Sequence, residues 1–211
     1  MRRDKANKII DLLHEMHPDA VCELNFTSTY ELLVATVLSA QTTDVSVNEA
    51  TKGLFAAANT PSEMIKLTPN EIRGYIKTLG LSNSKAGYVY DLSMSLLERF
   101  DGEVPTAMED LTSLSGVGRK TANVVMSVGF DIPAMAVDTH VKRLANRLGF
   151  SKTENVLIIE EDLKRQIPKY RWNLSHHLLI FHGRRVCKAR QPECGNCSVQ
   201  SLCKFYKTQV K

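Results

Sequence analysis

The 211-residue sequence has no apolar run approaching the roughly 20 residues that a bilayer-spanning helix needs. Its first residues, Met1-Arg2-Arg3-Asp4-Lys5, lead into an amphipathic pattern with acidic residues and lack the apolar core of a signal peptide. These absences lead us to expect a cytoplasmic protein with no membrane partner.

Stretches that alternate with period two are also scarce, and long linkers and low-complexity segments are absent. Helical periodicity dominates, and the hydrophobic content of 43% is enough for a packed core. We therefore predict a compact all-α protein, in which Asp44 is well placed to cap a helix. The predicted helices span 9–16, 30–38, 45–55, 61–67, 69–79, 85–100, 108–114, 119–128, 141–148, 156–166 and 172–183.

The formal net charge of +4 is unevenly distributed. Residues 1–133 carry 12 Lys+Arg and 17 Asp+Glu, whereas residues 134–211 carry 15 and 6. A basic segment on an otherwise acidic chain indicates a surface for a polyanion, although lysine-rich solvated helices are common and charge alone does not identify nucleic acid.

Residues Leu114–Ala122 (LSGVGRKTA) contain two glycines one residue apart, Gly116 and Gly118, between two predicted helices. Glycines permit a tight turn with φ values that a Cβ would oppose. The free amides of such a hairpin and of the following helix start, from Gly116 through Val117 and Gly118 to Arg119, suit an anion such as a phosphate.

Lys120 falls in the first turn of the helix after the hairpin, where the helix dipole favours anions and a cation is electrostatically misplaced. A surface lysine near a helix start is usually solvated and idle. The alternative is an amine that loses its proton and acts as a nucleophile.

Four of the five cysteines follow the spacing C-x6-C-x2-C-x5-C, and these are Cys187, Cys194, Cys197 and Cys203. Four thiolates within 17 residues predict a metal centre, because disulfides are disfavoured in a reducing cytoplasm. Structural zinc usually shows two C-x2-C pairs, so the unequal gaps favour an iron–sulfur cluster modestly. Cys22, far from the others, is most simply a buried free thiol.

The first gap between these cysteines is basic, with Lys188 and Arg190. A metal centre that fixes such a loop would present its cations to phosphates, so we expect these two residues to bind DNA if nucleic acid is the partner. A purely structural centre that stabilises a segment with little core is the alternative.

Asp138, in Val137-Asp138-Thr139-His140, opens a predicted helix and is most simply its N-cap. Together with Lys120 it provides an amine and a carboxylate, the minimal set for attack at the anomeric carbon of a nucleoside. The carboxylate would stabilise positive charge on the sugar or transfer protons.

These motifs, together with Leu38–Asp44 (LSAQTTD) and Gly80–Ala86 (GLSNSKA), occur in an order that resembles the endonuclease III family. Its members are bifunctional DNA glycosylases of the helix-hairpin-helix superfamily, and the resemblance covers nearly the whole chain. It implies two α-helical domains with the active site in the cleft between them. The six-helix domain would span 23–132 with the hairpin at 114–120, and the cluster domain would combine 1–22 with 133–211, its cluster loop being 187–203.

The resemblance also implies one [4Fe-4S] cluster on the four cysteines, damaged double-stranded DNA as partner and oxidised pyrimidines as substrates. Lys120 would release the base through a Schiff base and cleave the strand by β-elimination, assisted by Asp138. Gln41 and Leu81 would fill the space that a flipped nucleotide leaves. Asp44 and His140 would line the pocket, or merely cap and support their helices. We expect a monomer, associated with the nucleoid in a prokaryote.

The sequence leaves three alternatives to this interpretation. A monofunctional adenine-glycosylase relative would use a carboxylate before the Gln41 motif, and 32–41 contains no Asp or Glu. A non-catalytic DNA-binding module would not need Lys120 and Asp138 together. A redox protein would not need a phosphate-binding hairpin.

Overall fold

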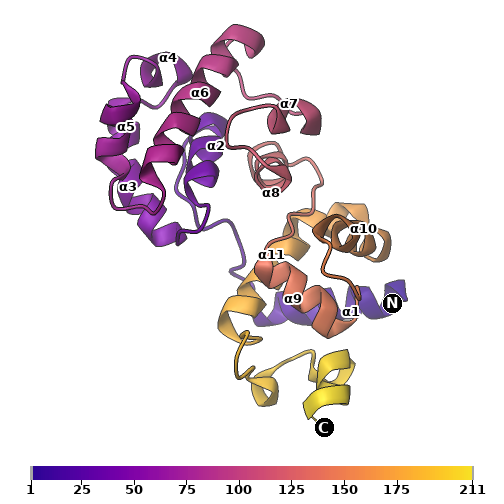
Figure 1. The fold of residues 1–211 in the computed structure, drawn as a ribbon. Helices are drawn as coiled ribbons and strands as arrows, with labels where there is room; N and C mark the ends of the chain where they lie inside the picture. Colours follow the sequence, from indigo (N-terminus) through magenta and orange to yellow (C-terminus); the bar gives the residue numbers. More distant parts are fainter. Residues whose placement is uncertain (1, 211) are drawn as a thin grey trace. The chain divides into compact units, whose positions relative to one another are not determined.

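The computed structural model describes residues 2–210, and no strand occurs in that range, which confirms the predicted all-α class. None of the helices formed by these residues is both long and apolar enough to span a bilayer. The chain divides into two compact units (Figure 1). Unit 1 contains 1–22 and 132–211, and unit 2 contains 23–131. The predicted boundary lies one residue further along the chain, and residues 1 and 211 of the predicted cluster domain lie outside the described residues.

Unit 2 contains seven α-helical segments, which correspond to the seven helices predicted between residues 30 and 128. The resemblance implied six, and the four-residue α4 is the shortest of the seven. A π-helical turn, η1 (Val125–Gly129), continues the last of them. The segments are α2 (Thr29–Leu38), α3 (Asp44–Ala57), α4 (Pro61–Met64), α5 (Pro69–Ile76), α6 (Ser82–Phe100), α7 (Met108–Thr112) and α8 (Arg119–Val124).

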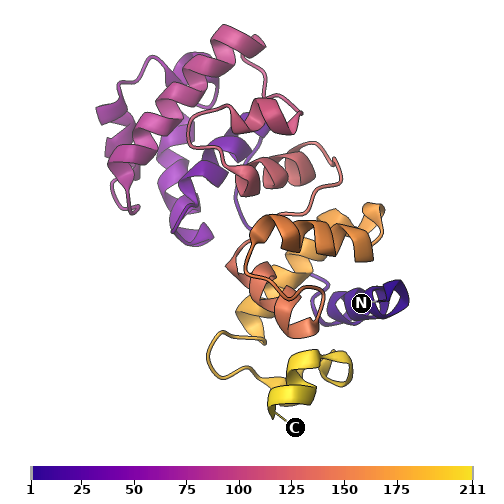
Figure 2. The ribbon, with the colours of Figure 1, turned by 45° about the vertical axis from the view of Figure 1, so that its right-hand side comes forward.

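Helix α2 forms the centre of unit 2. Every residue from Tyr30 to Leu38 is buried, so this helix has no solvent face. It packs against α3, α6, α8 and η1 (Figures 1 and 2). Its start is fixed by Ser28, whose hydroxyl accepts a hydrogen bond from the amide of Glu31 at 3.1 Å. The burial of α2 therefore determines where the neighbouring helices lie.

The glycine hairpin connects α7 to α8 and leans on α6. Gly116 has a φ of +75°, and a Cβ built on it would lie 2.8 Å from Cβ of Tyr88. Both backbone conformation and space therefore require glycine there. Gly118 differs from the expectation, because its φ of −90° is open to any residue and nothing lies within 4 Å of an added Cβ.

Unit 1 combines the N-terminal helix with residues 132–211. A 3-10 turn connects α10 to α11, and the cysteine segment contains two further 3-10 turns separated by irregular chain. The helices are α1 (Arg3–Met16), α9 (Thr139–Leu148), α10 (Val156–Gln166) and α11 (Trp172–Arg185), and the turns are η2 (Lys169–Arg171), η3 (Cys194–Asn196), η4 (Gln200–Leu202) and η5 (Tyr206–Val210).

Helix α1 belongs to the core of unit 1 although more than 100 residues separate it from its neighbours along the chain. Ile9, Ile10 and Leu13 are fully buried in one cluster with apolar residues of α9, α10 and α11. Each such side chain contributes about 1.5–3 kcal/mol relative to an exposed one. The same cluster includes Val199 and Cys203, so α1 also supports the cysteine segment.

Some helix starts differ from the sequence-based predictions. Thr43, not Asp44, caps α3, because Thr43 has the extended backbone of a cap and its hydroxyl accepts from the Ser46 amide at 3.3 Å. Asp44 is the first helical residue instead. Helix α6 starts three residues before the predicted position, at Ser82, directly after Leu81, whose backbone is left-handed.

The two hairpin glycines provide a matched pair for a stability test. We expect Gly116→Ala to lower the free energy of unfolding by about 1–3 kcal/mol, because the left-handed backbone and the contact with Tyr88 both oppose a methyl group. The control Gly118→Ala should change it by less than about 1 kcal/mol. Urea unfolding followed by circular dichroism measures both, and equal effects would contradict this account of the hairpin.

Candidate active site

Lys120 is the second residue of α8 and its side chain is exposed. No hydrogen bond or ion pair within residues 2–210 engages its amine. The backbone before it is fixed on one side by the buried Val117, whose amide donates to the carbonyl of Leu114 at 3.1 Å. A rigid hairpin thus presents an accessible amine at the start of a helix.

The hairpin residues divide into buried and accessible ones. Val117 is buried and its amide already donates to the carbonyl of Leu114, so, contrary to the prediction, neither its side chain nor its amide is available to an anion. Gly116, Gly118 and Arg119 are exposed, and the open space at Gly118 leaves room for a ligand to approach the backbone. Gly118 is also the N-cap of α8, and glycine supplies no capping side chain. This geometry suits recognition of an anion by backbone amides.

Asp138 is the N-cap of α9, as its simplest interpretation predicted. Its Oδ1 accepts a hydrogen bond from the amide of Val141 at 2.8 Å, and the side chain is half-buried. The cap fixes the carboxylate at one end of a well-formed helix. Because capping occupies one oxygen, a second role for the other is compatible with it.

His140 lies in the first turn of the same helix and contacts Arg143. Its Nδ1 is 3.1 Å from an Nη atom of Arg143. Burial lowers the pKa of His140. The Asp138 carboxylate opposes this shift, whereas the Arg143 cation adds to it. A neutral ring accepts at Nδ1, so His140 fits as a partner of Arg143.

Gln41 and Leu81 share an unusual backbone. Both are exposed and both have positive φ, 55° and 61°, which non-glycine residues rarely adopt. Leu81 is 59% exposed, so it is not part of the hydrophobic core. Gln41 lies between α2 and α3 and Leu81 precedes α6, so both belong to unit 2. Asp44, three residues after Gln41, is half-buried at the start of α3.

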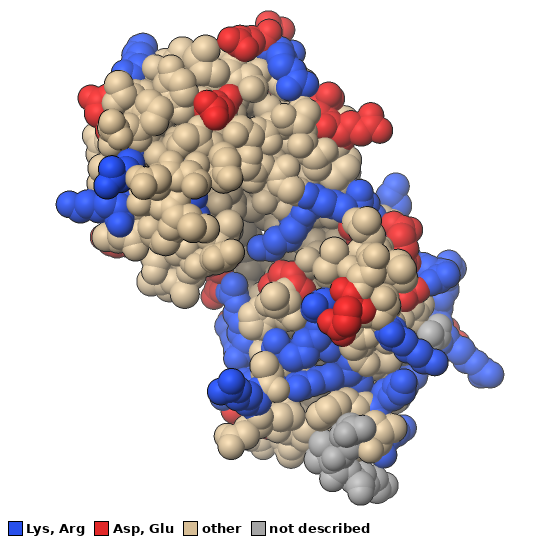
Figure 3. All heavy atoms as spheres, in the orientation of Figure 1, with Lys and Arg blue, Asp and Glu red and all other residues tan. Residues whose placement is uncertain are grey.

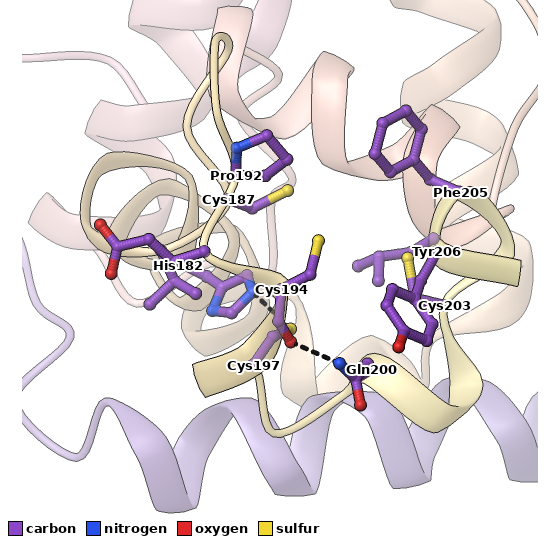
Figure 4. Close-up of a pocket in the computed structure, with 12 residues that line it drawn as sticks. His182, Cys187, Pro192, Cys194, Cys197, Gln200, Cys203, Phe205 and Tyr206 are labelled. Carbon is purple, nitrogen blue, oxygen red and sulfur yellow. Dashed lines mark hydrogen bonds between the residues drawn. The ribbon is translucent and has the colours of Figure 1, made fainter. Parts of the chain in front are cut away.

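The four C-terminal cysteines line one pocket of unit 1 (Figure 4). Burial raises the pKa of the Cys197 thiol to about 11, and burial together with the neighbouring thiols raises that of Cys194. Within residues 2–210, no three His, Cys, Asp or Glu side chains converge on a point that would hold a single metal ion. Four soft donors around one pocket fit an iron–sulfur cluster, whose iron ions would supply the positive charge that four thiolates need. Cys22, which we expected to be buried, is half-buried instead.

A chain of two histidines approaches the same pocket. His182 Nε2 lies 3.4 Å from the Cys197 sulfur, and its Nδ1 lies 3.0 Å from Nε2 of His17 on the N-terminal side of unit 1. Burial lowers the pKa of His182 to about 4, and the adjacent His17 adds to the shift. These histidines, one on α11 and one just after α1, connect the pocket to two other segments of the unit.

Two arginines of α9 hold the cysteine segment and were not anticipated from the sequence. Arg143 donates to the carbonyls of Cys187 and Gly183 at 3.1 and 2.8 Å. Arg147 donates to the carbonyls of Lys188 and Ala189 at 2.7 and 2.9 Å, and its Nη1 lies 3.3 Å from the Cys187 sulfur. Their spacing of four residues places them on one helix face, which is the only signal the sequence offered.

The basic loop after Cys187 is accessible, but its two cations differ. Lys188 forms an ion pair with Glu193 at 2.6 Å, with both side chains about half exposed. Arg190 is exposed.

The two units carry opposite charge. Unit 1 carries 19 Lys+Arg and 10 Asp+Glu, and Figure 3 shows many of these cations on one face of it. Unit 2, with 8 and 13, has the opposite sign.

Family comparisons agree with this geometry. Residues 34–169 match the HhH-GPD superfamily of base excision DNA repair proteins. Residues 187–203 match the iron–sulfur binding domain of endonuclease III, which bears out the prediction of a single iron–sulfur cluster on the cysteine segment.

Relatives match along almost the whole chain. Endonuclease III of Escherichia coli strain K12 is 47% identical over 205 residues, with 97% of each chain covered. That of Bacillus subtilis strain 168 is 45% identical over 196 residues, with 92% of this chain and 90% of the relative covered.

A solved structure of a trapped endonuclease III–DNA covalent intermediate is similar with a TM-score of 0.94, 43% identity and full coverage of both chains. A thermostable thymine-DNA glycosylase at 23% identity and a TM-score of 0.88 shares the fold. With its hairpin, its cysteine pocket and this similarity over its whole length, the chain belongs to the endonuclease III family of base excision DNA repair proteins.

Proposed function

We propose that this chain is a DNA glycosylase with AP lyase activity that releases oxidised pyrimidines of the thymine glycol class from duplex DNA. The observation that carries the proposal is the accessible amine of Lys120 directly after the hairpin. A relative with 43% identity forms a covalent intermediate with DNA, as an amine nucleophile would.

In the proposed reaction, the neutral amine of Lys120 attacks C1′ of the damaged nucleotide. A C1′–N bond to lysine forms while the bond to the base breaks, and the base leaves with the electron pair and takes up a proton. The sugar ring opens to a Schiff base. Loss of a proton from C2′ then expels the 3′-phosphate by β-elimination, and water releases the lysine.

Asp138 is the carboxylate of this mechanism. The oxygen that does not cap α9 stabilises the positive charge that develops on the sugar, and it accepts or returns protons. Lys120 and Asp138 belong to different units, so the proposal requires both to act on the same nucleotide. His140 and Asp44 line the pocket for the base.

The target nucleotide must leave the base stack, since C1′ is inaccessible to in-line attack within the duplex. Gln41 and Leu81 are the residues we propose for the vacated space. Both are exposed on strained backbone, a state that is common where a protein contacts its ligand. The backbone amides of Gly116, Gly118 and Arg119 hold a phosphate of the DNA backbone in this proposal, whereas the Val117 amide is bonded within the hairpin.

The cluster is a [4Fe-4S] group held by the four cysteines in this proposal. When bound, it would cross-link a segment of irregular chain and two short 3-10 turns, and would keep the basic loop in place. We propose that the enzyme acts as a monomer on double-stranded DNA in the cytoplasm, at the nucleoid of a prokaryote.

Borohydride trapping tests the nucleophile. The protein, mixed with a duplex that carries one thymine glycol and treated with sodium borohydride, should give a covalent adduct on a denaturing gel, because reduction fixes the Schiff base. Lys120→Gln should abolish the adduct, base release and nicking, while visible absorbance shows an intact cluster. Base release without an adduct would indicate a water nucleophile, and binding without release a non-catalytic module.

The two roles of Asp138 can be separated by two substitutions. Asp138→Asn keeps a capping oxygen but loses the charge, so single-turnover base release should fall about 100-fold or more with little change in stability. Asp138→Ala should in addition lower the free energy of unfolding by about 1 kcal/mol. An unchanged rate in Asp138→Asn would remove the carboxylate from the mechanism.

The salt dependence of DNA binding tests the basic loop. Arg190→Ala should weaken binding to all sequences and reduce the slope of log K against log salt by about 1, as loss of one phosphate contact does. Lys188→Ala should have a smaller effect, because Glu193 already neutralises part of its charge. Fluorescence anisotropy over a salt series measures both, and an unchanged slope in the double variant would exclude the loop from the interface.

A further inference from the structure

Two strained residues in unit 2 need a physical reason to stay in their conformation. Gln41 and Leu81 both hold a left-handed backbone conformation, which is unfavourable for a residue with a Cβ. Such strain persists only where neighbouring contacts over-determine it. Neither residue is buried, so its own side chain does not provide those contacts.

Lys85 forms hydrogen bonds near both strained residues: one with the backbone of Leu81 and one with Thr42, the residue after Gln41. Its own amide donates to the carbonyl of Leu81 at 3.0 Å and closes the first turn of α6. Its Nζ donates to the hydroxyl of Thr42, the residue after Gln41, at 2.8 Å. One residue therefore joins two segments that lie about 40 positions apart in the sequence.

Thr42 is itself tied to the end of α2. Its amide donates to the carbonyl of Ser39 at 3.1 Å, and its hydroxyl donates to the carbonyl of Ala40 at 3.3 Å. The hydroxyl can donate and accept at the same time, so both of its bonds are compatible. The chain on either side of Gln41 is thus fixed, and the Lys85 bond connects this turn to α6.

The position of Lys85 is costly for a lysine. The residue is only 2% exposed, and burial lowers the pKa of its amine. No carboxylate within residues 2–210 forms an ion pair with it. It also lies near the N-terminus of a 19-residue helix, where the dipole disfavours a cation. Burying an apolar side chain at this position would require less free energy than burying an amine, so the stability of the fold alone does not explain why a lysine is present.

We propose that Lys85 is a positioning residue that holds the Gln41 turn and the Leu81 turn in a fixed relation to each other. The side chains of Gln41 and Leu81 then enter the DNA together when the damaged nucleotide leaves the stack. The inference rests on the proposed function. Lys85 acts through Thr42 and the Leu81 carbonyl and does not touch the reacting atoms.

The test compares Thr42→Val, which removes the acceptor, with Thr42→Ser, which keeps it. The substrates are a thymine glycol duplex and a single-stranded abasic oligonucleotide, which has no stack to invade. We expect Thr42→Val to lower kcat/KM on the duplex about 3–10-fold, consistent with loss of one hydrogen bond. Borohydride trapping on the single strand should stay unchanged, and Thr42→Ser should match the wild type on both substrates.

Amide hydrogen exchange provides a readout that is independent of activity. Thr42→Val should raise exchange in both 39–43 and 80–85, although the mutation lies in only one of them, and Lys85→Met should do the same if it folds. Thr42→Ser should not. Faster exchange confined to 39–43 would overturn the idea that the two turns are coupled.

Other outcomes are equally decisive. An equal loss of activity of Thr42→Val on the duplex and on the single strand would show that Lys85 and Thr42 only stabilise the fold. Full activity of Thr42→Val on the duplex would show that the hydrogen bond has no positioning role. Either result would overturn this inference and leave the proposed function standing. If the wild type formed an adduct with neither the duplex nor the single strand, the proposed function would be overturned, and this inference with it.

Discussion

The burial of α2 on every side is the constraint on which unit 2 depends. A helix without a solvent face must be surrounded, and α3, α6, α8 and η1 surround it. The contact with η1 is close, since a Cβ on Gly129 would lie 3.1 Å from Cδ2 of Leu32. The turn that carries Gln41 begins where this helix ends, and the helix that carries Lys120 packs on its side. Gln41 and Lys120 are therefore both supported by one rigid element, which is what precise positioning requires.

Helix α6 extends this support to the surface. Leu81, Lys85 and Tyr88 recur at helical spacing, and each serves a different part of the proposed interface. Leu81 precedes the helix, Lys85 holds the Gln41 turn, and Tyr88 packs against the hairpin at Gly116. A single helix face thus links three segments that are distant in the sequence.

Unit 1 uses a different principle, because its cysteine segment has few helices of its own. Two arginines of α9 bind the carbonyls of this segment, and one of them also lies over the ring of Phe205 at 4.6 Å. The same helix begins at Asp138, whose cap fixes its first turn. One helix therefore connects the proposed catalytic carboxylate to the cysteine pocket. The positive charge of this unit, opposite in sign to that of unit 2, suits it to a polyanion.

Local signals in the sequence were sufficient to predict most of the helices and motifs described above. Periodicity and caps identified the helices, and α10 was placed at its observed bounds of Val156–Gln166. The cysteine spacing indicated the iron–sulfur segment, and the two glycines indicated the hairpin. Predictions failed where two local choices were close in energy. Thr43 and Asp44 are both good caps, and the geometry of the preceding turn selected Thr43.

What the sequence by itself determined is the helical class, the hairpin, the cysteine segment and the family to which they belong, because each of these is encoded in residues close together along the chain. Only the tertiary structure decided that Lys85 is buried against Thr42, that Leu81 is exposed on left-handed backbone, and that Arg143 and Arg147 bind the cysteine segment. These facts depend on contacts between distant residues, and no periodicity or propensity specifies which distant groups will meet when a chain packs.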